Sequence, residues 1–271
     1  MEQSHRTFAG SIPENYQRYL VPLIFEDYAA DLAGRLEVQS GGAVLETACG
    51  TGVVTRHLLA RLPQGGLVIA TDFNPGMIVE AKARLGEAPG LSFQEADATD
   101  LPFDDGAFDA LVCQFGVMFF PDKAKGYAEA ARILKPGAPF LFNVWDSLAE
   151  NRLSQLAHDT LGALFPEDPP SFLELPFGYQ DMTAILRALQ AAGFAHVDFS
   201  VQPRLSRAPG AQDVAAAFCR GSPLANYLAE RGEESEAQAL AALIQALEAA
   251  FGKGPIEAPM QAIQIRALKA G

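Results

Sequence analysis

Residues Val44–Gly52 have the sequence VLETACGTG, in which a short apolar run leads directly into a glycine-containing turn. Glycines in such a turn let the backbone approach a ligand closely, and the N-terminus of the following helix favours a polar or anionic group. A Gly-x-Gly pair alone is weak evidence for a binding site, because the pattern also occurs by chance. The segments on either side therefore decide how this turn is interpreted.

Apolar runs of strand length alternate with helical patterns from Gly42 to Trp145. Strands are predicted at Ala43–Thr47, Leu67–Thr71, Leu91–Glu95, Phe108–Cys113 and Pro139–Trp145. Helices are predicted after the turn as far as Pro63, from Asn74-Pro75 to Leu85, and from Asp122 to Leu134. Strands separated by helices of this length predict a parallel sheet with helices on both faces.

The second half of the chain is less regular. Helices are predicted at Leu148–Leu164, Met182–Ala191, Asp213–Arg220 and Glu233–Phe251, and strands at Ala195–Val201 and Met260–Leu268. The loop Phe165–Tyr179 is rich in proline and aromatic residues and is too long for a simple connection. We predict a single domain over residues 1–271. It has an N-terminal helical cover at 1–40, a cofactor-binding core at 42–145, and lid insertions on the substrate side at 147–180 and 205–255.

Polar residues and glycine stand at or just after the predicted strand ends, namely Glu46, Gly50, Asp72, Asp97 and Gln114. Right-handed crossovers bring these positions to one edge of the sheet. Asp72 follows Gly52 by 72 − 52 = 20 residues and is placed to accept hydrogen bonds from ribose hydroxyls. A carboxylate and a backbone N–H at Asp97-Ala98 suit an adenine edge. Singly, Asp72 fits a helix cap and Asp97 a turn, but together they favour a nucleoside site.

The turn fits a dinucleotide poorly. Dinucleotide binding favours Gly-x-Gly-x-x-Gly, and Thr55 occupies the position of the third glycine. Glu46 places an acid at the strand end, which suits a cation better than a pyrophosphate, and S-adenosylmethionine carries both an ammonium and a sulfonium group. The charge pattern therefore favours methyl transfer. An NAD-dependent oxidoreductase and a non-catalytic nucleotide-binding regulatory protein of the same fold remain as alternatives.

Four segments in order resemble the successive motifs of class I S-adenosylmethionine-dependent methyltransferases: VLETACGTG, ATDFNPGMI, EADATDLPFDDGAFDALVCQFGVMFFPD and ARILKPGAPFLFNVW. They are similar in particular to the group that includes the ubiquinone and menaquinone C-methyltransferases. The resemblance covers residues 42–145. It implies an α/β fold with a Rossmann-like, doubly wound sheet of seven strands, mostly parallel with an antiparallel last strand. It also implies S-adenosylmethionine as the cofactor.

The resemblance implies a role for each residue of the predicted site. The turn around Glu46, Ala48, Gly50 and Gly52 would wrap the methionine end of the cofactor, and Asp72 would hold the ribose. Phe73 and Met77 would flank the adenine, and Asp97 and Ala98 would contact its edge. Gln114 and Phe115 would lie near the transferable methyl group. In similar enzymes an N-terminal helix folds over the cofactor, where Tyr19 would close on the methionine carboxylate; the alternative is that its aromatic residues pack onto the sheet.

Ala48 departs from the family pattern, which has the first glycine of the turn at this position. An alanine restricts the backbone, so we expect a negative φ at Ala48.

Composition narrows the possible partners. The formal net charge of −13 argues against nucleic acids and anionic membrane surfaces as partners, and no apolar run reaches the length of a membrane span. The N-terminus lacks a signal-peptide pattern. Cys49, Cys113 and Cys219 lack metal-ligand spacing, and no metal site is predicted. We expect a cytoplasmic protein with reduced thiols, whose oligomeric state the sequence leaves open.

The sequence indicates the class of acceptor but not its identity. Methyl transfer is an in-line displacement, and a base is needed only if the nucleophile keeps its proton. Of the histidines, only His158 in the predicted lid is placed to reach an acceptor, and we assign no catalytic base. The 18 phenylalanines, several of them in the lids and in Phe115–Phe120, predict a small, apolar or aromatic acceptor. The same aromatics also fit a role in packing the lid onto the sheet.

Overall fold

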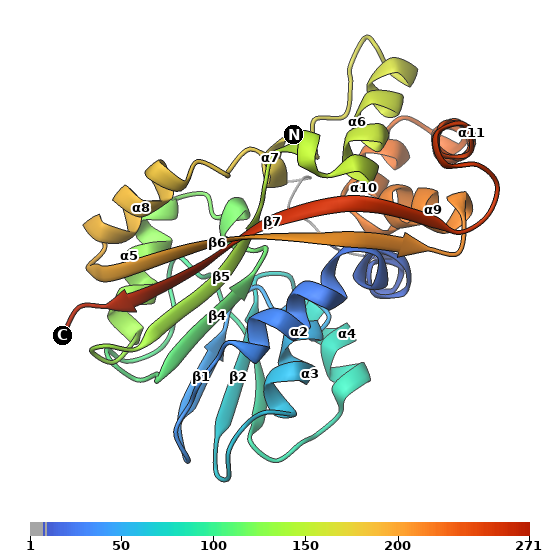
Figure 1. Ribbon diagram of the computed structural model, residues 1–271. Helices are drawn as coiled ribbons and strands as arrows, with labels where there is room; N and C mark the ends of the chain where they lie inside the picture. Colours follow the sequence, from blue (N-terminus) through green and yellow to red (C-terminus); the bar gives the residue numbers. More distant parts are fainter. Residues whose placement is uncertain (1–7, 9) are drawn as a thin grey trace. The chain divides into compact units, whose positions relative to one another are not determined.

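The computed structural model describes residue 8 and residues 10–271, except for the side chain of Glu233. The chain forms two compact units (Figure 1). Unit 1 consists of the described part of Met1–Glu26 with Asp146–Gly178 and Pro203–Gln261. Unit 2 consists of Asp27–Trp145, Tyr179–Gln202 and Ala262–Gly271. Each unit is described by itself.

A parallel sheet forms the centre of unit 2. Its five parallel strands are β1 (Ala43–Glu46), β2 (Leu67–Asp72), β3 (Leu91–Glu95), β4 (Ala110–Gln114) and β5 (Pro139–Trp145). Two longer strands, β6 (Phe194–Ala208) and β7 (Ile256–Lys269), complete the order β3-β2-β1-β4-β5-β7-β6, and β7 runs antiparallel to β5. This arrangement confirms the predicted Rossmann-like sheet with an antiparallel last strand.

The register aligns the carboxyl ends of the parallel strands. Glu46 at the end of β1 is paired with Ala70 of β2 and Val112 of β4. Asp72, which ends β2, is paired with Glu95, which ends β3. The polar residues that end or follow these strands therefore lie along one edge of unit 2, as right-handed crossovers require.

Helices cover both faces of this sheet. In Figure 1, α2 (Glu26–Gly34) and α3 (Val53–Leu59) lie on one side of the strands, and α5 (Lys123–Ile133) and α8 (Met182–Ala191) lie on the other. The helix α4 (Pro75–Leu85) begins, as predicted, with Asn74 as N-cap and proline at its first position. Because both faces are covered, the central strands β1 and β4 are apolar along most of their length, and Val44, Leu45, Leu111 and Val112 are buried.

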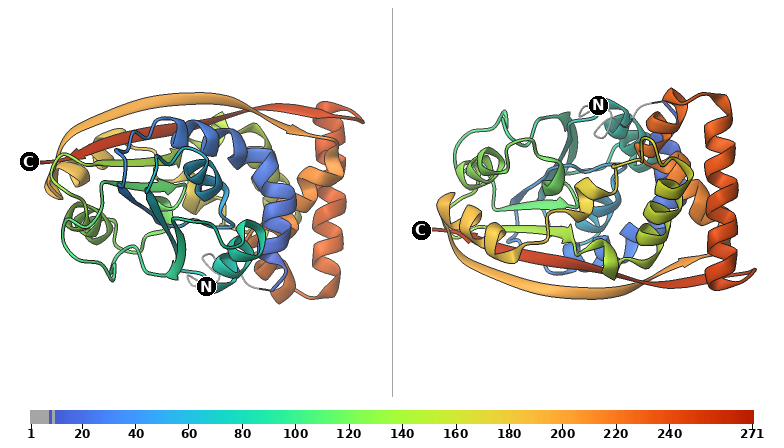
Figure 2. Two further views of the ribbon diagram at one scale, coloured as in Figure 1. Left: turned by 90° about the horizontal axis from the view of Figure 1, so that it is seen from below. Right: turned by 90° about the horizontal axis from the view of Figure 1, so that it is seen from above.

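Unit 1 is mainly helical. It contains α1 (Ile12–Asn15), the π-helix η2 (Tyr16–Phe25), the 3-10 turn η4 (Leu148–Glu150), α6 (Arg152–Leu164), α7 (Glu174–Phe177), α9 (Ala211–Gly221), α10 (Leu224–Glu230) and α11 (Glu233–Phe251). The alanine-rich helix α9 packs against η2, α10 and α11, and Figure 2 shows α9 beside α11. Gly221 permits a close approach, because a Cβ there would lie 3.1 Å from the carbonyl oxygen of Asn15.

Several elements differ from the sequence predictions. The strands β6 and β7 extend well beyond the predicted Ala195–Val201 and Met260–Leu268. β6 contains Pro203 and is an edge strand, where a proline removes no ladder hydrogen bond on its open side. The helix α10 was not predicted. Among the described residues, no helix is both long and apolar enough to cross a bilayer.

Candidate functional site

The turn after β1 is held by the two strands beside it. Thr47 N donates to Val112 O of β4 at 2.9 Å, and Cys49 N donates to Thr71 O of β2 at 2.9 Å. Gly52 caps α3 with a φ of 84°, and a Cβ at this position would lie 2.8 Å from Leu85 Cδ1. Glycine is therefore favoured at position 52 chiefly for its left-handed backbone conformation, because the Leu85 side chain can move away from an added Cβ.

The expectation of a negative φ at Ala48 is wrong. Ala48 has a φ of 52°, in the left-handed region that glycine adopts most easily. The reason lies in its neighbours, because Thr47 and Cys49 are hydrogen bonded to strands on opposite sides of β1. The single residue between them must turn sharply, so alanine keeps the glycine conformation and accepts a strain of about 1–2 kcal/mol.

Glu46 is a buried acid directly before this turn. Its side chain is 1% exposed, and its Oε2 accepts a hydrogen bond of 2.6 Å from the hydroxyl of Thr55. The pKa of Glu46 is raised to about 8, chiefly by burial and also by the nearby Asp72, whereas the hydrogen bond from Thr55 acts in the opposite direction. Thr55, which argued against a dinucleotide, is thus the polar partner of Glu46. A carboxyl held in this way ionises readily once a cation is beside it.

Asp72 connects the turn to the start of α4. Its Oδ2 accepts from Gly50 N at 2.9 Å, and its Oδ1 accepts from Asn74 N at 2.8 Å. Burial raises the pKa of the Asp72 carboxyl, and these backbone hydrogen bonds oppose the shift. Each carboxylate oxygen accepts more than one hydrogen bond, so Asp72 retains acceptor capacity for ribose hydroxyls.

The residues predicted around the adenine differ in exposure. Phe73 is 66% exposed, whereas Met77 is 3% exposed and belongs to the core. Asp97 Oδ1 accepts hydrogen bonds of 2.8 Å from both the backbone N and the hydroxyl of Thr99, and the adjacent Ala98 is half-buried. Phe73 therefore offers an open ring face, and Asp97 is held in a fixed turn.

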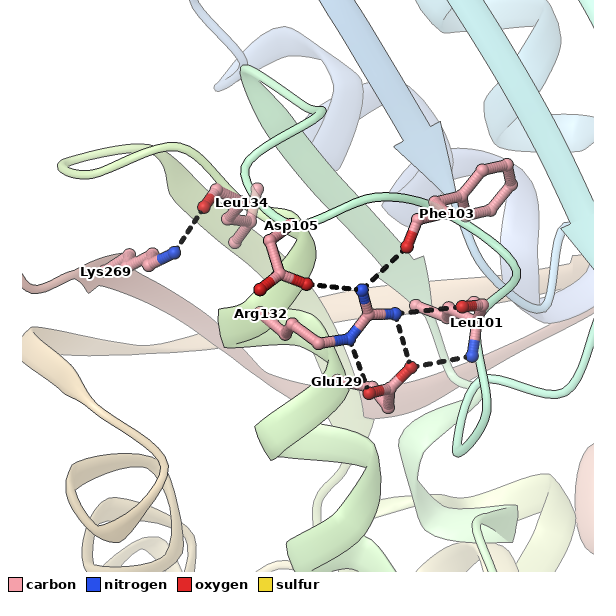
Figure 3. Close-up of polar contacts among 7 residues, drawn as sticks. All are labelled: Leu101, Phe103, Asp105, Glu129, Arg132, Leu134 and Lys269. Carbon is pink, nitrogen blue, oxygen red and sulfur yellow. Dashed lines mark hydrogen bonds and ion pairs between the residues drawn. The ribbon is translucent and has the colours of Figure 1, made fainter.

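A charged pair on α5 holds the loop that follows Asp97 (Figure 3). Arg132 donates to the carbonyl oxygens of Leu101 at 2.9 Å and Phe103 at 2.6 Å, and to Asp105 Oδ1 at 2.9 Å. Glu129 accepts from Arg132 Nε at 2.8 Å and from Leu101 N at 2.8 Å. The hydrogen bonds from Arg132 lower the pKa of Glu129. Sequence reasoning missed this pair, although the one-turn spacing of Glu129 and Arg132 on a predicted helix was visible.

An aromatic cluster lies at the ends of β4 and β5. The Phe115 ring stacks on Trp145 with 3.9 Å between centroids and 9° between planes, and Tyr28 meets both rings edge-on at 5.4 and 5.6 Å. Phe115 N donates to Asn143 O at 3.1 Å, which ties the residue after Gln114 to β5. Sequence analysis missed Trp145 as a site residue, although it ends a predicted strand.

Two residues considered in the sequence lie in unit 1. Tyr19 is a half-buried residue of η2, with Arg18 Cζ 5.0 Å from its ring centroid. His158 lies on α6 with a buried Nδ1 that has no hydrogen-bond partner among the described residues. The predicted contact of Tyr19 with the methionine carboxylate stays a prediction. The described part of the chain contains no group of three or more His, Cys, Asp or Glu side chains that could hold a metal ion.

Known proteins resemble this chain in sequence and in fold. A family model described as a methyltransferase domain matches residues 44–137, all within unit 2. A demethylmenaquinone methyltransferase of Clavibacter sepedonicus is 42% identical over 98 residues, which cover 36% of this chain and 39% of that protein. A ubiquinone/menaquinone biosynthesis C-methyltransferase of Saccharophagus degradans is 30% identical over 190 residues, covering 65% of this chain and 75% of that protein.

A solved structure extends the comparison to the fold. The Haemonchus contortus phosphoethanolamine N-methyltransferase 2, in complex with S-adenosyl-L-methionine, aligns with a TM-score of 0.60 at 14% identity. The alignment covers 96% of this chain and 57% of that one. The methyltransferase domain and these relatives identify S-adenosylmethionine as the cofactor. The chain belongs to the class I S-adenosylmethionine-dependent methyltransferases, in the group that includes the ubiquinone/menaquinone C-methyltransferases.

Proposed function

We propose that this enzyme transfers the methyl group of S-adenosylmethionine to a ring carbon of a small, largely apolar acceptor of the reduced-quinone class. The observation that carries the proposal is the pairing, on neighbouring strands, of a buried acidic turn at Glu46 with the stacked rings of Phe115 and Trp145. The printed names of the relatives from Clavibacter and Saccharophagus support the choice of acceptor.

The residues of unit 2 fit the cofactor. Glu46 is a buried carboxyl with a pKa of about 8, so a nearby charge can change its ionisation state. The ammonium group of the cofactor would favour the ionised form. The turn Ala48–Gly52 would hold the methionine end, and Asp72 would accept from the ribose. Phe73 would lie on the adenine, and Asp97 with Ala98 would contact its edge. When bound, S-adenosylmethionine supplies a methyl group already activated by the positive sulfur.

Gln114 and Phe115 would orient the acceptor. Because the methyl group needs no further activation, the contribution of these residues is alignment and exclusion of water. An aromatic ring acceptor would pack near the Phe115–Trp145 cluster with offset or edge-on geometry. We further propose that the insertions at 147–180 and 205–255 serve as the lid on the acceptor side and that Tyr19 closes on the methionine carboxylate. No catalytic base is assigned.

The proposal includes the cellular context. A net charge of −13 disfavours nucleic acids and anionic lipid surfaces as partners and is compatible with a small-molecule substrate. The described cysteines Cys49, Cys113 and Cys219 are buried free thiols, which fits a reducing cytoplasm.

Methyl transfer to defined acceptors tests the proposal. The protein would be incubated with methyl-labelled S-adenosylmethionine and a short-chain demethylmenaquinone, reduced with dithionite or left oxidised. Phosphoethanolamine would serve as the amine acceptor in a parallel reaction. We expect label in the quinol product, dependent on reduction, and S-adenosylhomocysteine in equal amount. Transfer to phosphoethanolamine but not to the quinol would contradict the proposed acceptor and leave the methyltransferase class unchanged.

A further inference from the structure

Two strained turns lie next to each other in unit 2. Among the residues that the structure describes, only Ala48 and Phe115 combine a side chain with a left-handed backbone, at φ values of 52° and 51°. Ala48 follows β1 and Phe115 follows β4, and these two strands are paired in parallel. Left-handed conformations are unfavourable for residues with a Cβ, and where they persist they tend to mark functional turns.

Gly116 joins the two turns. A Cβ added at Gly116 would lie 2.4 Å from Ala48 Cβ and 2.7 Å from Cys113 Sγ, closer than real Cβ contacts come. The φ of Gly116 is −101°, which any residue can adopt. Glycine is therefore needed at position 116 for space rather than for backbone conformation, and the Ala48 methyl group occupies that space.

The turn after β4 is also held at Phe115. The backbone N–H of Phe115 donates to Asn143 O, and its ring stacks on Trp145 at 3.9 Å. The turn Gln114–Gly116 is thus held at Gly116 by the Ala48 methyl group and at Phe115 by Trp145. A loss of either contact would let Gln114 and Phe115 shift together.

We propose that Ala48 is a positioning residue for methyl transfer: its methyl group sets the turn Gln114–Gly116 and so orients Gln114 and Phe115 toward the acceptor. This inference rests on the proposed function for the acceptor side of the site. It explains why the chain keeps a strained alanine where the family pattern has glycine. The backbone of Ala48 serves the cofactor turn, as glycine would, and its side chain serves the neighbouring turn.

The variant Ala48→Gly separates these two roles. Its backbone groups stay in place, so the dissociation constant of S-adenosylhomocysteine, measured by calorimetry, should stay within about twofold of the parent value. The KM for the short-chain demethylmenaquinol should rise about fivefold. This change corresponds to about 1 kcal/mol, which lies within the range of coupling energies between residues in contact. Trp145 is the only tryptophan of the chain, so its fluorescence emission should shift without any ligand. Ala130→Gly, which removes a buried methyl group from α5, should leave the emission unchanged.

A second set of variants tests the contact directly. Gly116→Ala should lower the free energy of unfolding and change the Trp145 emission, because the new Cβ meets Ala48. The double variant Ala48→Gly/Gly116→Ala should recover most of the lost stability and most of the parent Trp145 emission. The control Cys113→Ala/Gly116→Ala removes the other close neighbour and should recover less. If Gly116→Ala does not fold, folding of the first double variant but not of the second supports the proposal equally well.

Unchanged Trp145 emission in Ala48→Gly, or equal recovery in the two double variants, would overturn the proposal. Emission and unfolding are measured without an acceptor. If the parent enzyme does not methylate the quinol, the proposed function fails, and these measurements still decide the role of Ala48. A rise in the KM for S-adenosylmethionine with an unchanged acceptor KM would also contradict it, because the methyl group of Ala48 would then serve the cofactor turn.

Discussion

The hydroxyl of Thr55 donates a hydrogen bond of 2.6 Å to the Glu46 carboxylate in a fully buried position. Thr55 is the first-turn residue of α3 that stands where a dinucleotide-binding turn has its third glycine. The same residue that disfavours a pyrophosphate therefore supports the acid that favours a cation.

Thr55→Val keeps the shape of the side chain and removes its hydroxyl donor. We expect the free energy of unfolding near pH 9 to fall by about 1–3 kcal/mol, because Glu46 is then ionised, buried and without this hydrogen bond. Chemical denaturation at pH 9 measures the change. Thr55→Ser keeps the donor and should lose much less. An unchanged free energy of unfolding in Thr55→Val, or a larger loss in Thr55→Ser than in Thr55→Val, would contradict this role of the hydroxyl group.

The pH dependence of Glu46 has a defined sign. Its pKa is about 8 in the folded protein and near 4.5 in the unfolded chain, so unfolding releases a proton between these values. The Glu46 contribution to stability should therefore fall as the pH rises from about 5 to 8 and stay constant above. Denaturation midpoints of the parent and of Glu46→Gln, compared across this range, isolate the effect, and parallel pH profiles would contradict it.

Cofactor binding should show the opposite trend. The ammonium group of S-adenosylhomocysteine favours ionised Glu46, so binding below pH 8 must release a proton from this carboxyl. We expect the affinity to rise between about pH 6 and 8, with proton release visible by calorimetry in buffers of different ionisation enthalpy. Glu46→Gln should bind more weakly and with little proton release. Equal proton release in both proteins would place the titrating group elsewhere.

Asp72→Ala should weaken S-adenosylhomocysteine binding at least about tenfold, because charge-assisted hydrogen bonds to the ribose are lost. The structure adds a second effect, since the bonds from Gly50 N and Asn74 N to Asp72 are lost too and stability should fall. Asp72→Asn retains one acceptor oxygen and should fall between the two proteins in stability. Calorimetry on protein that is folded by circular dichroism gives the affinities. If Asp72→Ala binds S-adenosylhomocysteine with the parent affinity, Asp72 does not contact the ribose and serves only as a helix cap.

Arg132→Lys should loosen the loop after Asp97. A lysine cannot reproduce the planar fork that joins Glu129 to the carbonyl oxygens of Leu101 and Phe103. We expect faster amide hydrogen exchange at residues 97–106 and an affinity for S-adenosylhomocysteine that is lower by about three- to tenfold. Arg84→Lys changes an exposed arginine 4.0 Å from Glu80 and should have no effect on either measurement. Unchanged exchange in Arg132→Lys would show that the loop is held by other contacts.

The sequence by itself determined the positions of the five parallel strands and the class of cofactor. Apolar runs, glycine turns and strand-end acids lie within a few residues of each other, so periodicity places β1 to β5 and α4 nearly as observed. Glu46 and Asp72 could be predicted as site residues because each stands at the end of a predicted strand. The carboxyl ends of parallel strands meet at one edge of the sheet, whatever the details of side-chain packing. The lengths of β6 and β7 were underestimated. For β6, the edge position that tolerates Pro203 is not a local property of the sequence.

Only the tertiary structure decided how these segments act on one another. The backbone of Ala48 is left-handed because hydrogen bonds to β2 and β4 flank it, and no property of alanine itself predicts that conformation. The stacking of Phe115 on Trp145 and the hold of Arg132 on residues 101–105 join positions about thirty residues apart. Such contacts depend on the distances and directions that packing imposes, which local periodicity does not encode.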